Sequence, residues 1–254
     1  MKQTAWFVAP AFVLLALRRG AGLAGRGVII VRSAARRALP CSLNRLRERI
    51  APAMSFVSRG FRGRPHARAE GDRLPPGQYL VRDFPVLSVG PTPRPRLADW
   101  TFSINGEVDD VRRWTWEEFR ALPSETITRD IHCVTKWSKF DTVWEGVSVD
   151  TLLEGLDSAA DHVMAFCDGG YTTNIPLEDI TGGKAWVAFS YDGQALEAEH
   201  GGPARLLVPH LYFWKSAKWV RGLTLMNDDS PGFWEVNGYH MYGDPWLEQR
   251  YSGD

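Results

Sequence analysis

The sequence predicts an α+β fold in which a mixed β-sheet with a few short helices forms a single domain from about residue 75 onward. Three observations lead to this prediction. Short stretches of alternating apolar and polar residues recur along the chain. Turn signals such as Asn105-Gly106 and Asp192-Gly193 follow two of them. No long helical pattern and no internal repeat interrupt the series.

The charged residues are divided unevenly along the chain. Residues 1–70 contain 14 Lys and Arg against two acids, and residues 71–254 contain 16 against 28. The first part is therefore basic by +12 and the second acidic by −12. We expect an Arg-rich leader at residues 1–53, an extended arm at 54–98 and the globular domain at 99–254.

The leader gives little sign of export. Its apolar run, Trp6 to Leu17, is 12 residues long, which is too short to span a bilayer. The pair Arg18-Arg19 follows that run, whereas a twin-arginine signal precedes one. Met54-Ser55-Phe56 reads like a natural start, so residues 1–53 are upstream sequence, a targeting segment or a disordered arm. We expect a cytoplasmic protein, and without a recognition motif we expect no nucleic-acid partner.

The globular domain begins with a hairpin and a capped helix. Trp100, Phe102 and Ile104 alternate with polar residues, and Asn105-Gly106 predicts a tight turn. The capping box Thr115-Trp116-Glu117-Glu118 predicts the start of a helix that ends at Leu122-Pro123.

Next comes a strand that carries a cysteine at its end. Residues 125–134 alternate, with Ile127, Arg129, Ile131 and Cys133 on one face. This pattern places Cys133 where a loop can expose it. Ser148 then predicts the cap of a short helix. Further strands are expected at His162–Cys167, Tyr171–Ile175, Trp186–Tyr191, Arg205–Val208 and Trp219–Leu225.

Cys133 is the first candidate functional residue. Three cysteines cannot form a disulfide framework, which favours a reducing compartment. A lone cysteine is a buried core residue, a nucleophile or a ligand for a soft metal. A zinc site with His162 and Cys167, or with His200 and His210, matches no zinc spacing, and no oxyanion hole marks a cysteine hydrolase.

A second candidate region lies between residues 199 and 219. Gly201-Gly202-Pro203 predicts a tight turn that lets a planar ligand approach the backbone. Arg205 supplies a guanidinium group suited to phosphate or a polar heterocycle. Lys215-Ser216-Ala217-Lys218 combines ammonium groups, a hydroxyl and accessible backbone N–H groups. Together these residues predict a cradle for an anionic ligand.

These segments carry a resemblance to a known family. The Cys133 segment, Gly202 to Pro209 and Lys215 to Lys218 resemble the sulfite oxidase superfamily of molybdopterin enzymes. The likeness is greatest to small bacterial members similar to the catalytic subunit of the methionine sulfoxide reductase MsrP. It covers roughly residues 55–251 and includes the aromatic end from Gly232 to Trp246.

The resemblance implies a fold, a cofactor and site residues. It implies the sulfite-oxidase-type molybdopterin-binding fold and a Mo-molybdopterin cofactor, with Cys133 as the thiolate ligand of molybdenum. His200 and Arg205 would contact the pterin, and Ser216, Ala217 and Lys218 would hold the terminal phosphate. The relatives have asparagine where His200 stands. Their N-terminal pterin contact has no clear counterpart near Leu87 to Pro93.

The resemblance also implies an activity. The expected reaction is oxygen-atom transfer to or from a small, sulfur-containing substrate. Lys136, Lys139 and Arg129 are candidates for orienting it. With no heme domain in this chain, a flavoprotein or cytochrome would exchange electrons with it. The alternatives are a non-catalytic pterin- or anion-binding module and a hydrolase that uses Cys133 or zinc.

Overall fold

The structure is a computed structural model and describes residues 73–254. Six strands form its first sheet. They are β1 (Tyr79–Leu80), β4 (Glu125–His132), β5 (Trp137–Ser148), β8 (Trp186–Tyr191), β9 (Gln194–Ala195) and β10 (Arg205–Leu207). The long strand β5 pairs with β4 and β8 antiparallel and with β1 parallel. β8 pairs in turn with β9 and β10. The expected leader and residues 54–72 of the expected arm lie outside the described residues.

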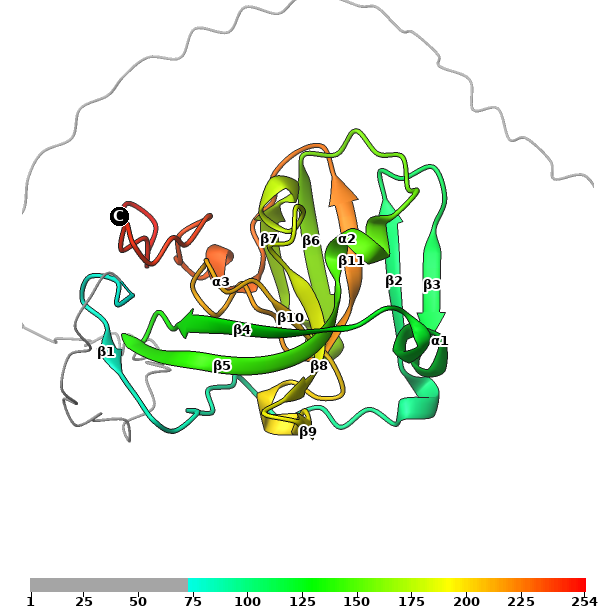
Figure 1. Cartoon of the computed structure of the whole chain (residues 1–254). Coiled ribbons are helices and arrows are strands. Elements are labelled where there is room, and N and C mark those ends of the chain that lie inside the picture. Colours follow the sequence, from blue (N-terminus) through cyan, green and yellow to red (C-terminus); the bar gives the residue numbers. More distant parts are fainter. Residues whose placement is uncertain (1–72) are drawn as a thin grey trace, which may run out of the picture. The chain divides into compact units, whose positions relative to one another are not determined.

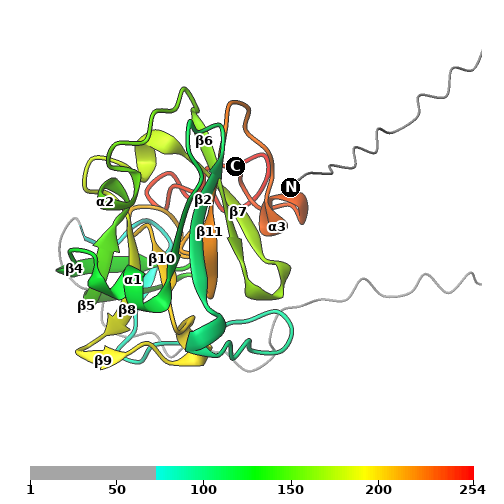
Figure 2. The ribbon, with the colours of Figure 1, turned by 90° about the vertical axis from the view of Figure 1, so that its right-hand side faces the viewer.

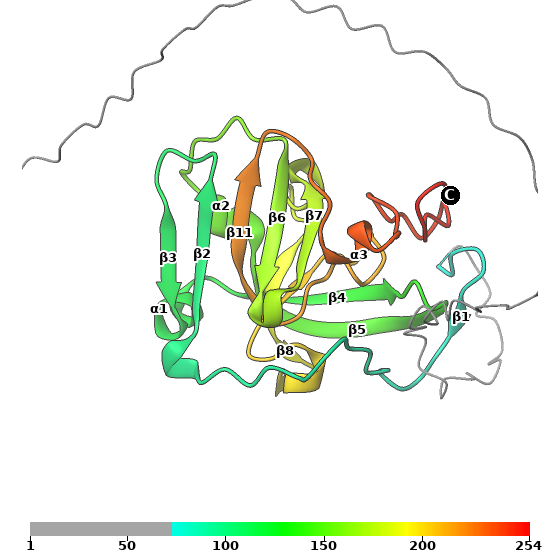
Figure 3. The same cartoon turned by 180° about the vertical axis from the view of Figure 1, so that it is seen from behind.

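Five strands form the second sheet, in the order β3-β2-β11-β6-β7. They are β2 (Thr101–Gly106), β3 (Arg112–Thr115), β6 (His162–Cys167), β7 (Thr172–Pro176) and β11 (Val220–Met226). Only β2 and β11 run parallel. In Figure 1 β4 and β5 lie across the view, whereas β2, β3, β6 and β11 stand upright in it; Figure 3 shows the same crossing from behind. The α+β class is confirmed, with two mixed sheets in place of one dominant sheet.

The helices are short, as expected. They are α1 (Trp116–Ala121), α2 (Val149–Leu153) and α3 (Phe233–Val236), with single 3₁₀ turns at Leu97–Asp99, Asp168–Gly170, Leu177–Asp179 and Ala198–His200. The predicted capping box is present at α1, and Ser148 caps α2. Figure 2 shows α3 beside β7. Among residues 73–254 no helix is long and apolar enough to cross a membrane.

The first sheet is buried on both faces. Val187 and Leu206 pack with Phe102 and other residues of the second sheet. Because side chains alternate along a strand, the neighbouring residues of β8 and β10 face the other way. Trp186 and Leu207 join a second apolar cluster there. Cys133 belongs to this second cluster, so the candidate site lies on the face turned away from the second sheet.

The strand β5 was not predicted from the sequence. Its middle contains polar residues and Gly146, which resemble a loop. A Cβ atom at Gly146 would lie 2.8 Å from the carbonyl oxygen of Val187 on the paired strand, so only glycine fits this close approach. Two other predictions differ in detail. Asn105-Gly106 ends β2 and the turn follows it, and an irregularity in β4 between Arg129 and Ile131 breaks the expected alternation.

The described part of the expected arm is attached to the first sheet. The amide of Tyr79 donates to the carbonyl of Lys136, and the amide of Val81 donates to that of Ser138. Arg73 forms ion pairs of 2.6 and 2.7 Å with Asp130 and Asp141. The arm therefore follows the turn between β4 and β5, which is where Cys133 lies.

The cap of α1 supplies the first testable prediction. Replacing Thr115 by Ala removes the hydroxyl that accepts a hydrogen bond from the amide of Glu118. We expect the free energy of unfolding to fall by about 1 kcal/mol, measured by urea denaturation. Thr115→Ser keeps the hydroxyl and is the matched control. Equal stability of the two variants would contradict a role for the cap.

Candidate active site

Cys133 lies in the tight turn that joins β4 to β5. The turn is closed by hydrogen bonds from the amide of Cys133 to the carbonyl of Trp137 and from the amide of Lys136 to that of Cys133. The residue is only 7% exposed, so the expected exposing loop is a compact turn instead. Burial raises the pKa of the Cys133 thiol, while a hydrogen bond from Thr135 and the charges of Arg250 and Lys218 lower it.

Arg205 enters the same region from β10. It is 1% exposed, and its guanidinium group donates to the carbonyl oxygens of His200 and Ser216 at 2.8 and 2.6 Å. The group also lies over the ring of Phe213, at 4.0 Å from the ring centre. Its Nε atom is buried without a partner among residues 73–254. Burial lowers the pKa of Arg205 to about 9.

Lys218 is the second cation at the site. Its ammonium group donates to the carbonyl oxygens of Leu87 and Glu199 at 2.7 and 2.8 Å. Burial and the nearby charge of Arg205 lower the pKa of Lys218 to about 7. The charge of Cys133 acts on the pKa of both Lys218 and Arg205. The predicted thiol and the two predicted cations are therefore neighbours, although 72 residues separate Cys133 from Arg205.

The positive charge at this site has no carboxylate partner. Within residues 73–254 neither Arg205 nor Lys218 has a carboxylate oxygen within 4.0 Å, and both bond only to carbonyl groups. The carboxylate of Glu199 is paired with Arg94 instead. Buried charge without a counter-charge is unfavourable. An anionic ligand beside Cys133 would supply the missing negative charge.

The other predicted ligand contacts, Ser216, Ala217 and His200, help to hold Arg205 and Lys218 in place. Ser216 is buried; its hydroxyl accepts from the amide of Val208 at 2.8 Å. Ala217 is buried, and its carbonyl accepts from the amide of Leu206. The ring of His200 stacks on Phe84 at 4.0 Å between ring centres. In this arrangement Ser216 and Ala217 join the cation-bearing segment to β10.

The glycine turn serves the packing of the site. A Cβ atom at Gly201 would lie 2.9 Å from Cβ of Lys218, and one at Gly202 would collide with the carbonyl of Leu196. Gly201 also has a φ of 109°, which favours glycine. The turn was predicted to let a planar ligand approach the backbone. The space beside these two glycines is occupied by the chain itself, which brings Lys218 close to the turn.

The residues expected to orient a substrate lie at different places. Lys136 is exposed in the turn of Cys133, and the ammonium group of Lys139 donates to the carbonyl of Arg82. Arg129 lines a surface cavity of about 600 Å³ together with Trp186 and His210. Their role in orienting a substrate stays a prediction.

His132 does not form a dyad with Cys133, as the strand alternation predicted. Its Nδ1 atom lies 2.8 Å from the hydroxyl of Ser138. Burial lowers the pKa of His132 to about 4, so the ring is neutral near pH 7. It therefore adds no positive charge beside the thiol.

Arg250 is a residue of the site that sequence reasoning missed. Its guanidinium group donates to the carbonyls of Val134 and Pro76 at 2.9 and 3.3 Å and lies over the ring of Tyr212. It thus joins the C-terminal segment to the turn of Cys133 and to the arm. One feature of the sequence could have drawn attention to this residue: Arg250 is the only Lys or Arg after residue 221.

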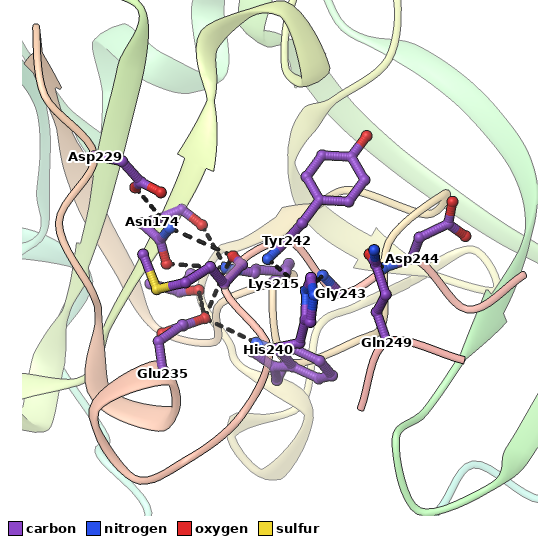
Figure 4. A network of polar contacts seen from close by, with 12 residues as sticks. Asn174, Lys215, Asp229, Glu235, His240, Tyr242, Gly243, Asp244 and Gln249 are labelled. Atoms are coloured by element: carbon purple, nitrogen blue, oxygen red, sulfur yellow. Dashed lines mark hydrogen bonds and ion pairs between the residues drawn. The ribbon is translucent and has the colours of Figure 1, made fainter. Parts of the chain in front are cut away.

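A buried polar network surrounds Lys215, the first residue of the segment Lys215-Ser216-Ala217-Lys218 (Figure 4). The ammonium group of Lys215 is 2.7 Å from the carboxylate of Glu235 on α3 and donates to both oxygens of Asn174 and to the carbonyl of Met241. Both charged side chains are 0% exposed. Trp214 also donates to Glu235, at 2.8 Å. Lys215 was predicted to belong to the ligand cradle, but its side chain joins the C-terminal segment to the domain.

Comparison with known proteins gives one family. The family described as the oxidoreductase molybdopterin binding domain matches residues 89–234. A Bacillus subtilis (strain 168) protein described as the uncharacterized oxidoreductase YuiH is 41% identical over 195 residues, which cover 76% of this chain and 98% of that protein.

Two more distant relatives are described by an activity. The putative protein-methionine-sulfoxide reductase subunit YedZ1 of Azospira oryzae is 32% identical, over 66% of this chain and 66% of that protein. The sulfite oxidase of Arabidopsis thaliana is 25% identical, over 66% of this chain and 54% of that protein. This chain therefore spans about half the length of that sulfite oxidase.

The buried ion pair supplies the second prediction. Glu235→Gln leaves the ammonium group of Lys215 buried without its counter-charge, and we expect a loss of about 3–5 kcal/mol in the free energy of unfolding. The exposed pair of Arg96 with Asp99 is the control, where Asp99→Asn should cost less than about 1 kcal/mol. Similar losses in the two variants, measured by urea denaturation, would contradict this account.

Proposed function

The chain belongs to the oxidoreductase molybdopterin binding domain family and is a molybdopterin oxidoreductase of the sulfite oxidase superfamily, and we propose that it transfers an oxygen atom to or from a small sulfur-containing substrate. In this proposal Cys133, Arg205 and Lys218 would hold a Mo-molybdopterin cofactor. The substrate is an S-oxide or a sulfur oxyanion. Electrons pass singly between this chain and a separate partner protein.

One observation carries the proposal. The buried thiol of Cys133 lies near one buried and one half-buried cation, Arg205 and Lys218, and neither cation has a carboxylate partner within residues 73–254. A thiolate is a suitable ligand for a soft or high-valent metal, and the cations suit an anionic cofactor with a phosphate group. The unpartnered Nε atom of Arg205 adds a further donor. The residues present therefore fit this cofactor.

The chain's own residues would hold and orient the cofactor. When bound, the cofactor supplies the oxygen-atom and electron-transfer chemistry. Thr135 donates to the sulfur of Cys133 at 3.2 Å, which fixes its orientation and stabilises the thiolate. The positive charge of Arg250 acts in the same direction. Arg205 and Lys218 neutralise the ligand's charge, and the surrounding apolar cluster keeps water away from the sulfur.

His200, Ser216 and Ala217 have supporting roles in this proposal. His200 presents its carbonyl to Arg205 and its ring to Phe84 of the arm. Ser216 and Ala217 hold the segment that carries Lys218 against β10. The zinc alternative has less support, since residues 73–254 contain no group of three or more His, Cys, Asp or Glu side chains placed to hold a metal.

The proposal extends to the setting of the reaction. We place the protein in the cytoplasm, where the reduced cysteines Cys133 and Cys167 are compatible with the redox conditions. The partner would be a flavoprotein or a cytochrome. We also propose that residues 99–254 form the catalytic domain and that the arm at 54–98 contributes to the site through Phe84 and Leu87.

Molybdenum content tests the ligand assignment. Protein made from Met54 in a host that produces the cofactor should contain about one Mo per chain by inductively coupled plasma mass spectrometry, because a thiolate ligates one metal centre. Cys133→Ala should lose the metal. Cys167→Ala is the matched control, since Cys167 is also a buried free cysteine, and it should keep the metal.

Two results would contradict the proposal. Folded wild-type protein without molybdenum would remove the cofactor from the account. A Cys133→Ala variant with full molybdenum content and full turnover would remove the ligand role of Cys133.

The pKa of Lys218 gives a prediction for protein made without cofactor. Between its folded pKa of about 7 and its ordinary value of 10.5, the unfolded chain binds a proton at Lys218 that the folded chain has lost. The free energy of unfolding therefore rises with pH across this window, by up to about 1.4 kcal/mol per pH unit. Lys218→Met should remove this contribution, measured by urea denaturation at pH 7 to 10.

Cofactor-loaded protein is the comparison for this prediction. An anionic ligand beside Lys218 keeps the ammonium group protonated, so the loaded wild type should lack this part of the pH dependence. The same slope in the wild type and in Lys218→Met without cofactor would show that Lys218 stays charged in the folded chain.

A further inference from the structure

The C-terminal segment carries an unusual exposed apolar surface. Nine large hydrophobic residues are exposed within residues 73–254, and five of them lie after residue 235. These five, here called the C-terminal face, are Val236, Met241, Trp246, Leu247 and Tyr251. Val236 and Leu247 are the most exposed of the five, at 70% and 67%. The five residues belong to one segment, residues 236–251, and exposed apolar surface of this kind is characteristic of interaction sites.

The segment that carries this face folds back on itself. Tyr239 and Tyr251 form an isolated β-bridge, and the amide of Ser252 donates to the carbonyl of Gly238. The amide of Gln249 donates to the carbonyl of Asp244, which closes the loop that presents Trp246 and Leu247. Figure 1 shows this end of the chain beside α3. The buried pair of Lys215 with Glu235 fixes the segment to the domain, so the face is held in place.

A series of aromatic rings connects the C-terminal face with the thiol site. Tyr239 stacks on Trp234 at 4.8 Å and contacts Tyr251 at 5.6 Å between ring centres. Trp234 and Tyr239 pack against the apolar cluster that contains Cys133. Trp246 packs edge-on against His132, the neighbour of Cys133 in the chain. The surface nearest these rings is therefore close to the redox site.

The exposed charged residues of this segment are all acidic. Residues 222–254 contain no Lys or Arg other than Arg250, which is buried. Exposed acids of the same region are Asp228, Asp229, Glu248 and Asp254. An apolar centre with an acidic surrounding is complementary to a partner with a basic rim.

We propose that the C-terminal face is the docking site of a one-electron carrier protein whose own docking face is basic around an apolar centre. This inference rests on the proposed function, since only an oxidoreductase exchanges electrons with such a carrier. The apolar residues would bring the two redox groups close together, and the acidic residues would steer the encounter. Each encounter moves one electron and no atoms.

The experiment uses molybdenum-loaded protein and a basic mitochondrial cytochrome c as the probe. The enzyme is reduced with dithionite, excess reductant is removed, and stopped-flow absorbance follows the conversion of ferric to ferrous haem. Each transferred electron reduces one haem. We expect the second-order rate constant to fall at least fivefold when ionic strength rises from about 20 to 200 mM, because screening weakens steering between opposite charges.

Substitutions separate the face from the rest of the surface. The double variant Val236→Ser with Leu247→Ser, and separately Asp228→Lys, should each lower the rate constant at least threefold at low ionic strength. The matched controls are Val111→Ser and Asp110→Lys, which change an exposed apolar residue and an exposed acid in the turn after β2. They should leave the rate unchanged. Reduction of a small uncharged quinone should be the same in all variants.

Several outcomes would overturn the inference. They are equal effects in the control variants, a rate independent of ionic strength, and faster transfer to an acidic carrier such as a plant-type ferredoxin. A dimer in wild-type protein that the Val236→Ser, Leu247→Ser variant dissociates would assign the face to a second copy of this chain. Absence of molybdenum would contradict the proposed function instead, and normal quinone reduction without the expected variant effects would contradict only the docking site.

Discussion

The constraint on which the site depends is the burial of positive charge beside a thiol. Arg205 is buried and Lys218 half-buried, and within residues 73–254 their only hydrogen-bond partners are carbonyl oxygens. Carbonyl dipoles orient a cation but do not neutralise it. The fold holds both groups in place through β10, the glycine turn and the arm. That arrangement supports the proposed binding site for an anion, and the thiol would give the site the chemistry of a metal centre.

The two lysines of the segment 215–218 differ in what they do in the fold. From the sequence alone, Lys215 and Lys218 are equally good candidates for ligand binding, since both are ammonium groups in a short basic run. In the fold Lys215 meets a buried carboxylate and three further acceptors, so its charge is compensated by the chain itself. Lys218 meets no carboxylate among residues 73–254. The presence or absence of a counter-charge, which is a tertiary property, decides which of them is available to a ligand.

Much of the fold could be predicted from local patterns. The capping box at α1, the cap at Ser148 and the strands β6 and β8 follow from interactions between residues close in sequence. The strand β5 could not, since Gly146 is explained only by the backbone of the strand paired with it. At the site, the resemblance identified Cys133, Arg205 and Lys218 as candidates. The burial of Cys133 and the approach of Arg250 depend on contacts across more than 100 residues of chain.

The arm has a consequence for how long a ligand remains in this protein. Its carbonyls at Phe84 and Leu87 contact His200 and Lys218, and its strand β1 is paired with β5 beside the thiol. A ligand held by Lys218 beside Cys133 would lie next to this arm. Local detachment of the arm would free the ammonium group of Lys218 and the ring of His200 from these contacts. The residence time of such a ligand would then depend on the free energy of that local opening as well as on the ligand's own contacts.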